Sequence, residues 1–247
     1  MNVESNWDVC SNFLWDSNYV ESLDKLFRKY RVKNILDCAG GTGFPSIELK
    51  KRGWNVIYTD MSKSMIDVFE QKSKNNNIEL EHYNLNWIEL SKFFTKKFDV
   101  VLCRGNSLIY VDSWGKSYIG IDSLNKIQES LKVFYNLLNK EGFLCIDIIN
   151  KGEYHKAKYP LIENLGQKII DGNKVSLSWI INHDYQKKLR IVKSKLTVDK
   201  KQEEFTYYSY LLEHKELIKM LKEIGFVKIE EVKLEGEKSY TTYLAFK

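Results

Sequence analysis

Residues 34–43 read Asn34-Ile35-Leu36-Asp37-Cys38-Ala39-Gly40-Gly41-Thr42-Gly43, an apolar strand that runs directly into a glycine-rich turn. Pro45 follows where the first turn of a helix would begin. Glycines let the backbone pass close to a ligand, and the N-terminus of a helix favours an anionic group. The stretch therefore predicts an α/β fold with a nucleotide-like cofactor at the end of its first strand.

A second strand, Asn55 to Thr59, ends in Asp60, 23 residues after Asp37. An acid at this place can accept hydrogen bonds from ribose hydroxyls. The dinucleotide fingerprint would require a third glycine where the chain has Ser46, and it does not include an acid such as Asp37 before the loop. An NAD-dependent oxidoreductase is therefore the least favoured alternative.

Apolar segments of strand length alternate with amphipathic helical segments, which is typical of a parallel sheet covered by helices. The predicted strands are Asn34 to Cys38, Asn55 to Thr59, Phe98 to Cys103 and Phe143 to Ile148. Tyr19 to Phe27 shows helical spacing, Ser62 is suited to capping the next helix, and a long helix from Leu124 is predicted to end near Gly142.

The pattern changes to three longer β-like runs, Lys174 to His183, Leu189 to Val198 and Glu203 to Leu212. They predict an antiparallel cap. A helix over Lys215 to Ile224 and two segments, Phe226 to Val232 and Tyr240 to Phe246, complete the chain. We therefore expect residues 1–247 to form a single domain, with residues 151–212 inserted as a substrate cap.

Composition argues against a nucleic-acid-binding, a membrane-spanning and a metal-binding protein. The chain has 247 residues, 43% of them apolar, and a net charge of +5, with lysine and glutamate interspersed. This predicts no nucleic-acid partner, and the basic residues from Lys187 to Lys195 fit the solvent-facing side of a strand better than a phosphate site. The absence of a leader-like start, a membrane-length apolar run or a Cys-x-x-Cys pair indicates a cytoplasmic, reducing environment without a metal site.

The run DCAGGTG resembles the first motif of class I S-adenosylmethionine-dependent methyltransferases. Three further segments resemble glycine N-methyltransferase and the glycine/sarcosine N-methyltransferases: Asn86-Trp87, Gly105-Asn106-Ser107 and Gly142 to Asn150. The resemblance covers residues 30–150 well and the rest in outline. It implies a Rossmann-like, seven-stranded, mostly parallel sheet with helices on both faces and an antiparallel β cap after the fifth-motif strand. It also implies S-adenosyl-L-methionine as cofactor and S-adenosyl-L-homocysteine as product.

The resemblance also implies the site residues. Those expected to bind the cofactor are Asp37, Ala39, Gly40, Gly41, Gly43, Asp60, Met61, Asn86, Trp87, Arg104 and Gly105. Trp87 either stacks on adenine or fills the core. Asn106 is expected to orient the acceptor, and Tyr208 and Tyr210, with Tyr207 as a neighbour, are expected to complete the pocket from the cap. Asp147 is expected to be structural.

The chain departs from the glycine enzymes in two places. Those enzymes have an arginine shortly after the fifth-motif acid that clamps the substrate carboxylate, whereas Asp147 is followed here by Ile148-Ile149-Asn150. The N-terminal segment has no arginine before Arg28, and Trp7, Trp15 or Tyr19 are the candidates to fill that space. Arg104 and Arg190 are the candidate replacements for the clamp.

The leading functional hypothesis is methylation of a small-molecule amine, such as glycine, sarcosine or a related amino acid. The alternatives are an O-, S- or C-methyltransferase on another metabolite and a non-catalytic S-adenosylmethionine-binding protein. The cap strands offer edges through which copies of the chain can form a homo-oligomer. The sequence does not define the acceptor further.

Overall fold

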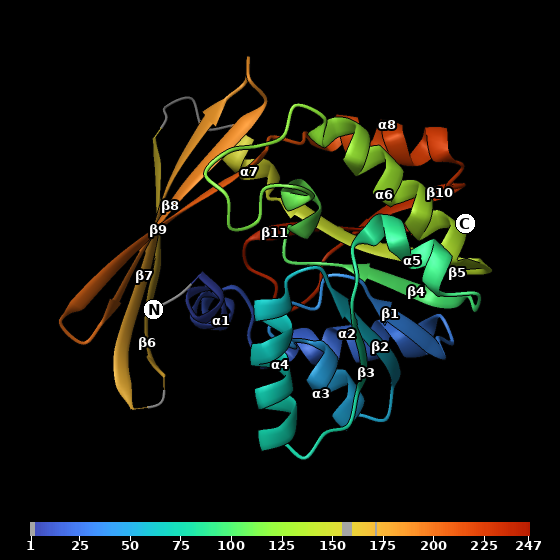
Figure 1. The fold of residues 1–247 in the computed structure, drawn as a ribbon, viewed down its shortest axis with the longest axis horizontal. Coiled ribbons are helices and arrows are strands. Elements are labelled where there is room, and N and C mark those ends of the chain that lie inside the picture. Colours follow the sequence, from blue (N-terminus) through green and yellow to red (C-terminus); the bar gives the residue numbers. More distant parts are fainter. Residues whose placement is uncertain (1–2, 155–159, 171) are drawn as a thin grey trace.

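The computed structural model describes residues 3–154, 160–170 and 172–247, in which the strands form two sheets (Figure 1). The larger sheet has seven strands in the order β10-β11-β5-β4-β1-β2-β3. Its strands are β1 (Asn34–Asp37), β2 (Asn55–Asp60), β3 (Glu81–Asn84), β4 (Phe98–Cys103), β5 (Leu138–Ile149), β10 (Lys228–Val232) and β11 (Tyr240–Phe246). The strand β11 runs antiparallel to both β5 and β10, and all the other neighbouring strands of this sheet pair in parallel. The predicted seven-stranded, mostly parallel sheet is therefore confirmed.

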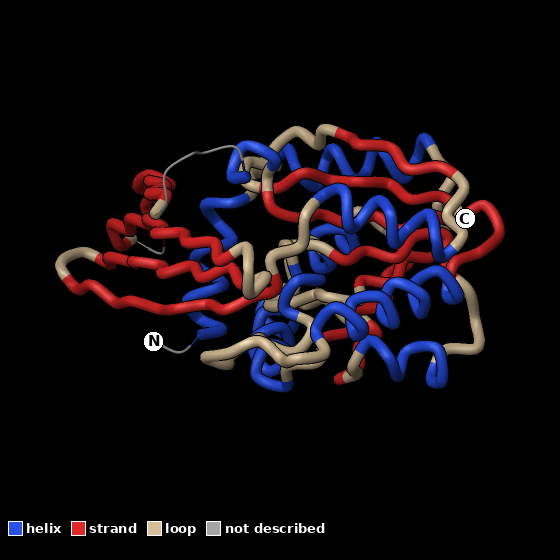
Figure 2. The backbone as a smooth tube through the Cα atoms, turned by 90° about the horizontal axis from the view of Figure 1, so that it is seen from above, coloured by secondary structure: helices blue, strands red, loops and turns tan. Residues whose placement is uncertain are grey.

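Helices cover both faces of this sheet (Figures 1 and 2). Successive strand residues point to opposite faces. Ile35 accordingly packs in one apolar cluster and Leu36 in the other. The first cluster contains residues of α2 (Ser17–Lys29), α3 (Ser46–Lys51) and α4 (Lys63–Asn75); the second contains residues of α5 (Trp87–Phe93), α6 (Ser123–Leu137) and α8 (His214–Ile224). The central strands β1, β2, β4 and β5 are thus buried on both sides, which explains their continuous apolar runs.

The end of α6 and the start of β5 both differ from the sequence prediction. The long helix ends at Leu137 and not near Gly142, because residues from Leu138 onward already belong to β5. Gly142 lies within that strand, where a Cβ atom would come within 2.9 Å of the Asp99 carbonyl oxygen. Its glycine therefore permits close approach to β4 and does not mark a helix end.

The four remaining strands form the second sheet, β6 (Leu161–Ile170), β7 (Asn173–Asp184), β8 (Leu189–Val198) and β9 (Lys201–Tyr210), all antiparallel in chain order. The short helix α7 (Lys151–Tyr154) leads into it after β5. Three of the strands correspond to the predicted runs, and the insertion after the fifth-motif strand is confirmed. The strand β6 was missed because it lies at the sheet edge and none of its residues is fully buried.

The first helix, α1 (Val3–Leu14), lies between the two sheets (Figure 1). It contacts α4 on one side and β6 on the other. The Tyr207 hydroxyl of β9 donates a 2.6 Å hydrogen bond to the buried side-chain oxygen of Asn6. The indole of Trp15, just after the helix, donates a 2.5 Å bond to Glu237. These contacts place α1 over the C-terminal ends of β1 and β4.

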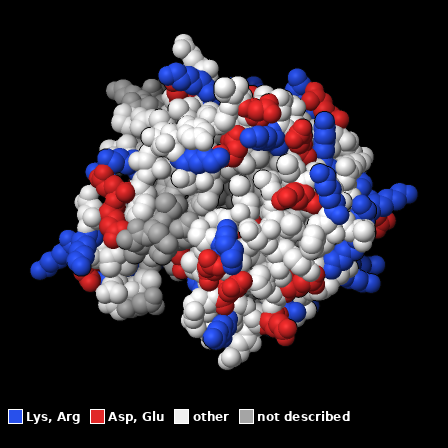
Figure 3. All heavy atoms as spheres, viewed as in Figure 1, with Lys and Arg blue, Asp and Glu red and all other residues white. Residues whose placement is uncertain are grey.

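The surface carries both signs of charge. Lysines and arginines lie among aspartates and glutamates over the face seen in Figure 3. Among the helices of the described residues, none combines the length and apolarity needed to cross a bilayer.

Candidate active site

The loop after β1 is shaped by its glycines. A Cβ atom on Gly40 would lie 2.0 Å from the Tyr58 ring, so this position cannot hold a side chain without moving that ring. Gly41 has φ +55°, in the left-handed region that glycine adopts without strain. The Tyr58 hydroxyl donates to the Gly41 carbonyl oxygen. The loop is therefore held tightly against β2.

Two acids at neighbouring strand ends hold this loop. Asp37, at the end of β1, accepts hydrogen bonds from the Ser46 hydroxyl at 2.5 Å and the Ala39 amide at 3.3 Å. Asp60, at the end of β2, accepts bonds of 2.9 and 2.8 Å from the amides of Gly41 and Ser62. Burial raises the pKa of Asp37 to about 7 and that of Asp60 to about 6.

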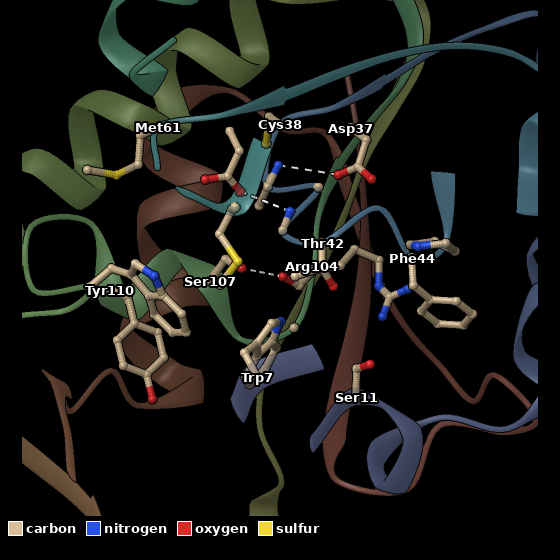
Figure 4. Close-up of a pocket in the computed structure, with 18 of the residues that line it drawn as sticks. Trp7, Ser11, Asp37, Cys38, Thr42, Phe44, Met61, Arg104, Ser107 and Tyr110 are labelled. Atoms are coloured by element: carbon tan, nitrogen blue, oxygen red, sulfur yellow. Dashed lines mark hydrogen bonds between the residues drawn. The ribbon is translucent and has the colours of Figure 1, made fainter. Parts of the chain in front are cut away.

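A cavity of about 830 Å³, counted to its mouth, lies over the C-terminal ends of β1, β2 and β4 (Figure 4). This is the point where the strand order reverses, and ligands of open α/β sheets bind there. Nine of the residues predicted to bind a cofactor line the cavity: Asp37, Ala39, Gly40, Gly41, Asp60, Met61, Trp87, Arg104 and Gly105. Most of the residues predicted from the sequence to bind the cofactor therefore lie together in the fold.

Gly43 and Asn86, also predicted to bind the cofactor, do not line this cavity. A Cβ atom on Gly43 would lie 2.7 Å from Ile47, so its role is close packing where α3 begins. The Asn86 side chain accepts the amide of Ile88 and caps α5. Both residues shape the neighbouring backbone.

Trp87, the first residue of α5, lines the cavity, as do Met61 and Met65 from the segment after β2. Its indole nitrogen donates a 2.5 Å hydrogen bond to the Cys38 carbonyl oxygen. The ring is buried and packs edge-on against Phe134 of α6. Trp87 therefore fills the core with one part of its ring and forms a wall of the cavity with another.

Asp147 of β5 organises the loop at the opposite end of the cavity. Its carboxylate accepts bonds of 3.1 and 2.6 Å from the amides of Gly105 and Asn106, and one of 3.2 Å from Arg104 Nε. Burial raises the pKa of Asp147, partly offset by the Arg104 charge. Gly105 and Asn106 both have positive φ, +71° and +58°. Asp147 is structural, as the sequence suggested, but it fixes the geometry of the site.

Trp7 of α1 reaches toward both loops (Figure 4). A Cβ atom on Gly41 would lie 3.5 Å from its Nε1, and one on Gly105 would lie 3.3 Å from its Cζ2. Trp15 and Trp114 meet the Trp7 ring edge-to-face. Trp7 and Trp15 thus line the larger cavity, whereas Tyr19, the third candidate, does not.

A second, smaller cavity adjoins the first, and the two share Trp7, Tyr110 and Trp114. Its remaining walls are Cys10, Asn106, Trp179, Arg190, Val192, Tyr207 and Tyr240. Within the described part of the chain, three buried polar atoms there have no hydrogen-bond partner: Asn106 Oδ1, Trp114 Nε1 and Trp179 Nε1. One acceptor and two donors are therefore available to a ligand.

The cap contributes to the second cavity through Tyr207 and not through the two tyrosines expected to be catalytic, Tyr208 and Tyr210. Tyr207 lines it and stacks on Trp114. Tyr208 and Tyr210 do not line it, because alternation along β9 turns them to the opposite face; Tyr210 packs in the core with the helices of the larger sheet. Tyr110, Trp114, Trp179 and Tyr240 were missed because isolated aromatic residues carry no spacing signal.

Arg190, which sequence analysis offered as a substitute clamp, is 3% exposed in β8. Its Nε and Nη2 donate bonds of 2.7 and 3.0 Å to Glu153 of α7. His183 lies 2.6 Å from the same carboxylate. The structure therefore brings a buried cation to the second cavity from the insertion, not from the strand after Asp147.

The family described as methyltransferase domain matches residues 35–139, which run from β1 to the start of β5 and include both loops of the larger cavity. Over these residues the chain is similar to the class I S-adenosylmethionine-dependent methyltransferases. The larger cavity fits this family's cofactor, since it has a strand-end acid, a glycine loop and a buried guanidinium nitrogen, Arg104 Nη1, without a partner among the described residues.

The chain is similar to curated methyltransferases in sequence and to solved proteins in fold. A glycine/sarcosine N-methyltransferase from Aphanothece halophytica is 29% identical over 161 residues, which are 62% of this chain and 57% of the relative. The chain spans about half the length of the curated relatives it matches. DesVI from Streptomyces venezuelae has the same fold, with a TM-score of 0.74 at 14% identity over 99% of this chain and 98% of that one. An amino pentose methyltransferase from Micromonospora echinaspora reaches 0.70 at 13% identity, over 97% and 95%.

Proposed function

We propose that this chain transfers a methyl group from S-adenosylmethionine to the nitrogen of a small, carboxylate-bearing amine, such as glycine, sarcosine or a related amino acid. The observation that carries the proposal is the second cavity, where a buried arginine and an unpaired amide oxygen lie beside the cofactor cavity. The names of the curated relatives support the acceptor class. The cofactor supplies an electrophilic methyl group.

The larger cavity has a suitable group for each part of this cofactor. Asp60 would accept hydrogen bonds from ribose hydroxyls. The adenine ring would lie between Met61 and Trp87, which both line the cavity. The glycine loop from Ala39 to Gly41 would lie along the cofactor, because it presents backbone and no bulky side chains. Asp37 would orient that loop.

Asn106 is proposed to orient the acceptor amine. Its Oδ1 is buried and has no partner among the described residues, and its backbone is fixed by Asp147. An amide oxygen accepts a hydrogen bond from an amine N–H, which turns the nitrogen lone pair toward the methyl donor. The amine must arrive uncharged, because a protonated nitrogen has no lone pair with which to react.

Arg190 is proposed to bind the acceptor carboxylate. A guanidinium has five N–H donors, and Glu153 takes two bonds on one side. The unpaired Trp179 N–H lines the same cavity and provides another donor. A carboxylate there would face the Arg190 charge and accept a bond from the Trp179 N–H, whereas an acceptor without oxygen atoms would leave that N–H buried and unpaired.

The insertion is part of the same proposal. Trp179, Arg190 and Tyr207 all come from residues 151–212, so we propose that these residues are a substrate cap on a single 247-residue domain. We further propose that the protein works in a cytoplasmic, reducing compartment. This is supported by its four cysteines, which are all buried and form no disulfide.

The test is S-adenosylhomocysteine production by purified protein with glycine, sarcosine, dimethylglycine, other amino acids, small polyamines and amino sugars. We expect turnover with at least one amino acid and a large loss in Arg190→Lys, which keeps the charge but not the planar fork. Turnover only with acceptors that lack a carboxylate would overturn the acceptor class. Cofactor binding without any product would instead favour a non-catalytic binding protein.

A further inference from the structure

Arg104 is the single cationic side chain among the described residues that line the larger cavity. It follows β4 directly and is 4% exposed. Its Nε donates to Asp147 at 3.2 Å, and its Nη2 lies 3.7 Å from a Glu237 carboxylate oxygen. Its Nη1 is buried and has no hydrogen-bond partner within the described chain. A guanidinium held firmly on two sides therefore keeps one nitrogen available.

The surroundings of Arg104 fix its position and exclude water. The guanidinium carbon lies 4.2 Å from the centre of the Tyr19 ring and 5.4 Å from that of Trp15. Trp15 is itself held by its hydrogen bond to Glu237. A buried N–H without an acceptor costs free energy. A hydrogen bond from it to a charged acceptor is also stronger here than in water, because the surroundings have a low dielectric constant.

The polarity of the cavity orients an elongated ligand. The acids Asp37 and Asp60 lie at the ends of β1 and β2, while Arg104 lies beyond them at the end of β4. With the ribose at Asp60, the other end of S-adenosylmethionine extends toward β4. That end carries an α-carboxylate, which the two acids repel and Arg104 attracts.

We infer that Arg104 Nη1 binds the α-carboxylate of the cofactor, so that the methionyl end is anchored by a residue of the central sheet. This inference rests on the proposed cofactor but not on the proposed acceptor. The two partners of Arg104 make it a rigid anchor: Asp147 also fixes Gly105 and Asn106, so the cofactor carboxylate and the acceptor-orienting amide are positioned by the same carboxylate.

The test compares ligands by isothermal titration calorimetry, without any methyl acceptor. S-adenosylhomocysteine carries the carboxylate, its decarboxylated analogue S-adenosyl-3-thiopropylamine lacks only that group, and 5′-methylthioadenosine lacks the whole aminocarboxylate end. The wild-type protein should bind the decarboxylated analogue about 10- to 100-fold more weakly than S-adenosylhomocysteine, as expected when a charged hydrogen bond is lost. Equal affinity for the two ligands would overturn the inference.

Variants assign the effect to Arg104. Arg104→Gln should lose about 10- to 100-fold in affinity for S-adenosylhomocysteine and change its affinity for the decarboxylated analogue little, as in a double-mutant cycle. Arg104→Lys keeps the charge beside Asp147 and Glu237 and should lose less, which guards against a glutamine variant that fails to fold. Arg52→Gln, an exposed arginine after α3, is the matched control.

The outcomes separate this inference from the proposed function. Equal losses for all three ligands in the Arg104 variants would make Arg104 a purely structural residue and leave the methyltransferase proposal intact. Failure of the wild-type protein to bind any of the three ligands would contradict the cofactor assignment itself.

Discussion

Asp37 and Asp60 are carboxyl groups that the fold buries at neighbouring strand ends. Each is held by two hydrogen bonds from the glycine loop or its flanks. Burial raises both pKa values, so the fold favours their protonated forms relative to the unfolded chain. Keeping both acids ionised therefore costs stability, and the proposed ribose contact of Asp60 would make use of that charge.

Asp60→Asn should reveal this cost. Asp60 has a pKa of about 6 when folded against about 4 unfolded, so its stabilising contribution is complete below pH 4 and is lost as the pH rises through 6. Asparagine does not ionise, so the variant does not lose this stability as the pH rises. The free energy of unfolding of the variant minus that of the wild type should therefore rise by about 1–2 kcal/mol from pH 4 to pH 8. Urea unfolding of the cofactor-free proteins measures it. An identical difference at both pH values would contradict the assignment.

The same variant should bind S-adenosylhomocysteine about 10-fold more weakly at pH 8, since an amide accepts ribose hydroxyls less strongly than a carboxylate does. Calorimetry of wild type and Asp60→Asn checks this expectation. Unchanged affinity would remove Asp60 from the ribose site.

Asn106→Ala should separate acceptor chemistry from cofactor binding. The side chain lines the smaller cavity, while only neighbouring residues line the larger one. Turnover should fall about 10-fold, which corresponds to about 1.4 kcal/mol of lost transition-state stabilisation. Cofactor affinity should change little. Asn136→Ala, an exposed asparagine on α6, is the control. A larger loss in cofactor affinity than in turnover would count against the orienting role.

At the scale of elements, α1 is a helix that its own sequence favours weakly. Asparagine, serine and aspartate are poor helix formers, and α1 reads VESNWDVCSNFL. Its stability comes from packing: Cys10, Phe13 and Leu14 are buried in the core, and Asn6 is bonded to β9. The helix therefore depends on elements that lie far away in the sequence.

Tyr207→Phe tests this dependence. It removes the hydroxyl that bonds to the Asn6 side chain, whose nitrogen has no partner among the described residues. A buried amide without its partner costs about 1–3 kcal/mol. Amide hydrogen exchange in α1 should become about 10-fold faster or more. Tyr208→Phe, on the opposite face of the same strand, should leave it unchanged, and equal acceleration in both variants would refute the role of the hydroxyl.

Strands with two buried faces were predictable, and two strands without a buried residue were not. The strands β1, β2 and β4 were predicted within a residue because both of their faces are buried. The strand β3 reads EHYN and β6 has no fully buried residue, so neither shows an apolar pattern. In the site, motifs located the glycine loop and the loop after β4. Side chains that reach the site from other elements, such as Arg190 and Tyr240, could be placed only by tertiary structure.

At the scale of the molecule, one buried group of charges ties α7, the first helix of the insertion, to the antiparallel sheet that follows it. Glu153 of α7 accepts hydrogen bonds from Arg190 of β8 and lies 2.6 Å from His183 of β7. Burial alone would raise the pKa of Glu153, but these two partners outweigh it and lower the pKa to about 2. The second cavity is bounded by this arginine, so its shape depends on how α7 packs against the antiparallel sheet.

Glu153→Gln should destabilise the whole protein by about 3–5 kcal/mol at pH 7, because it leaves the Arg190 charge buried and poorly paired. The glutamate contribution is present above the unfolded pKa of about 4.5 and is lost as the pH falls toward 2. The difference between variant and wild type should therefore shrink below pH 4.5. Chemical unfolding across this range measures it, with Glu129→Gln on the exposed side of α6 as control. A pH-independent difference would contradict the ion pair.

The packing of α1 has a consequence for the order in which the protein matures. Cys10, Asn6 and Trp15 meet partners that are synthesised 184, 201 and 222 residues later. During translation α1 therefore emerges long before these partners, with its apolar face uncovered, and contacts of such long sequence separation form slowly. A nascent chain that lacks β8, β9 and the segment before β11 therefore has no partners to hold α1 in place, and Trp7 and Trp15 close the larger cavity only late in folding.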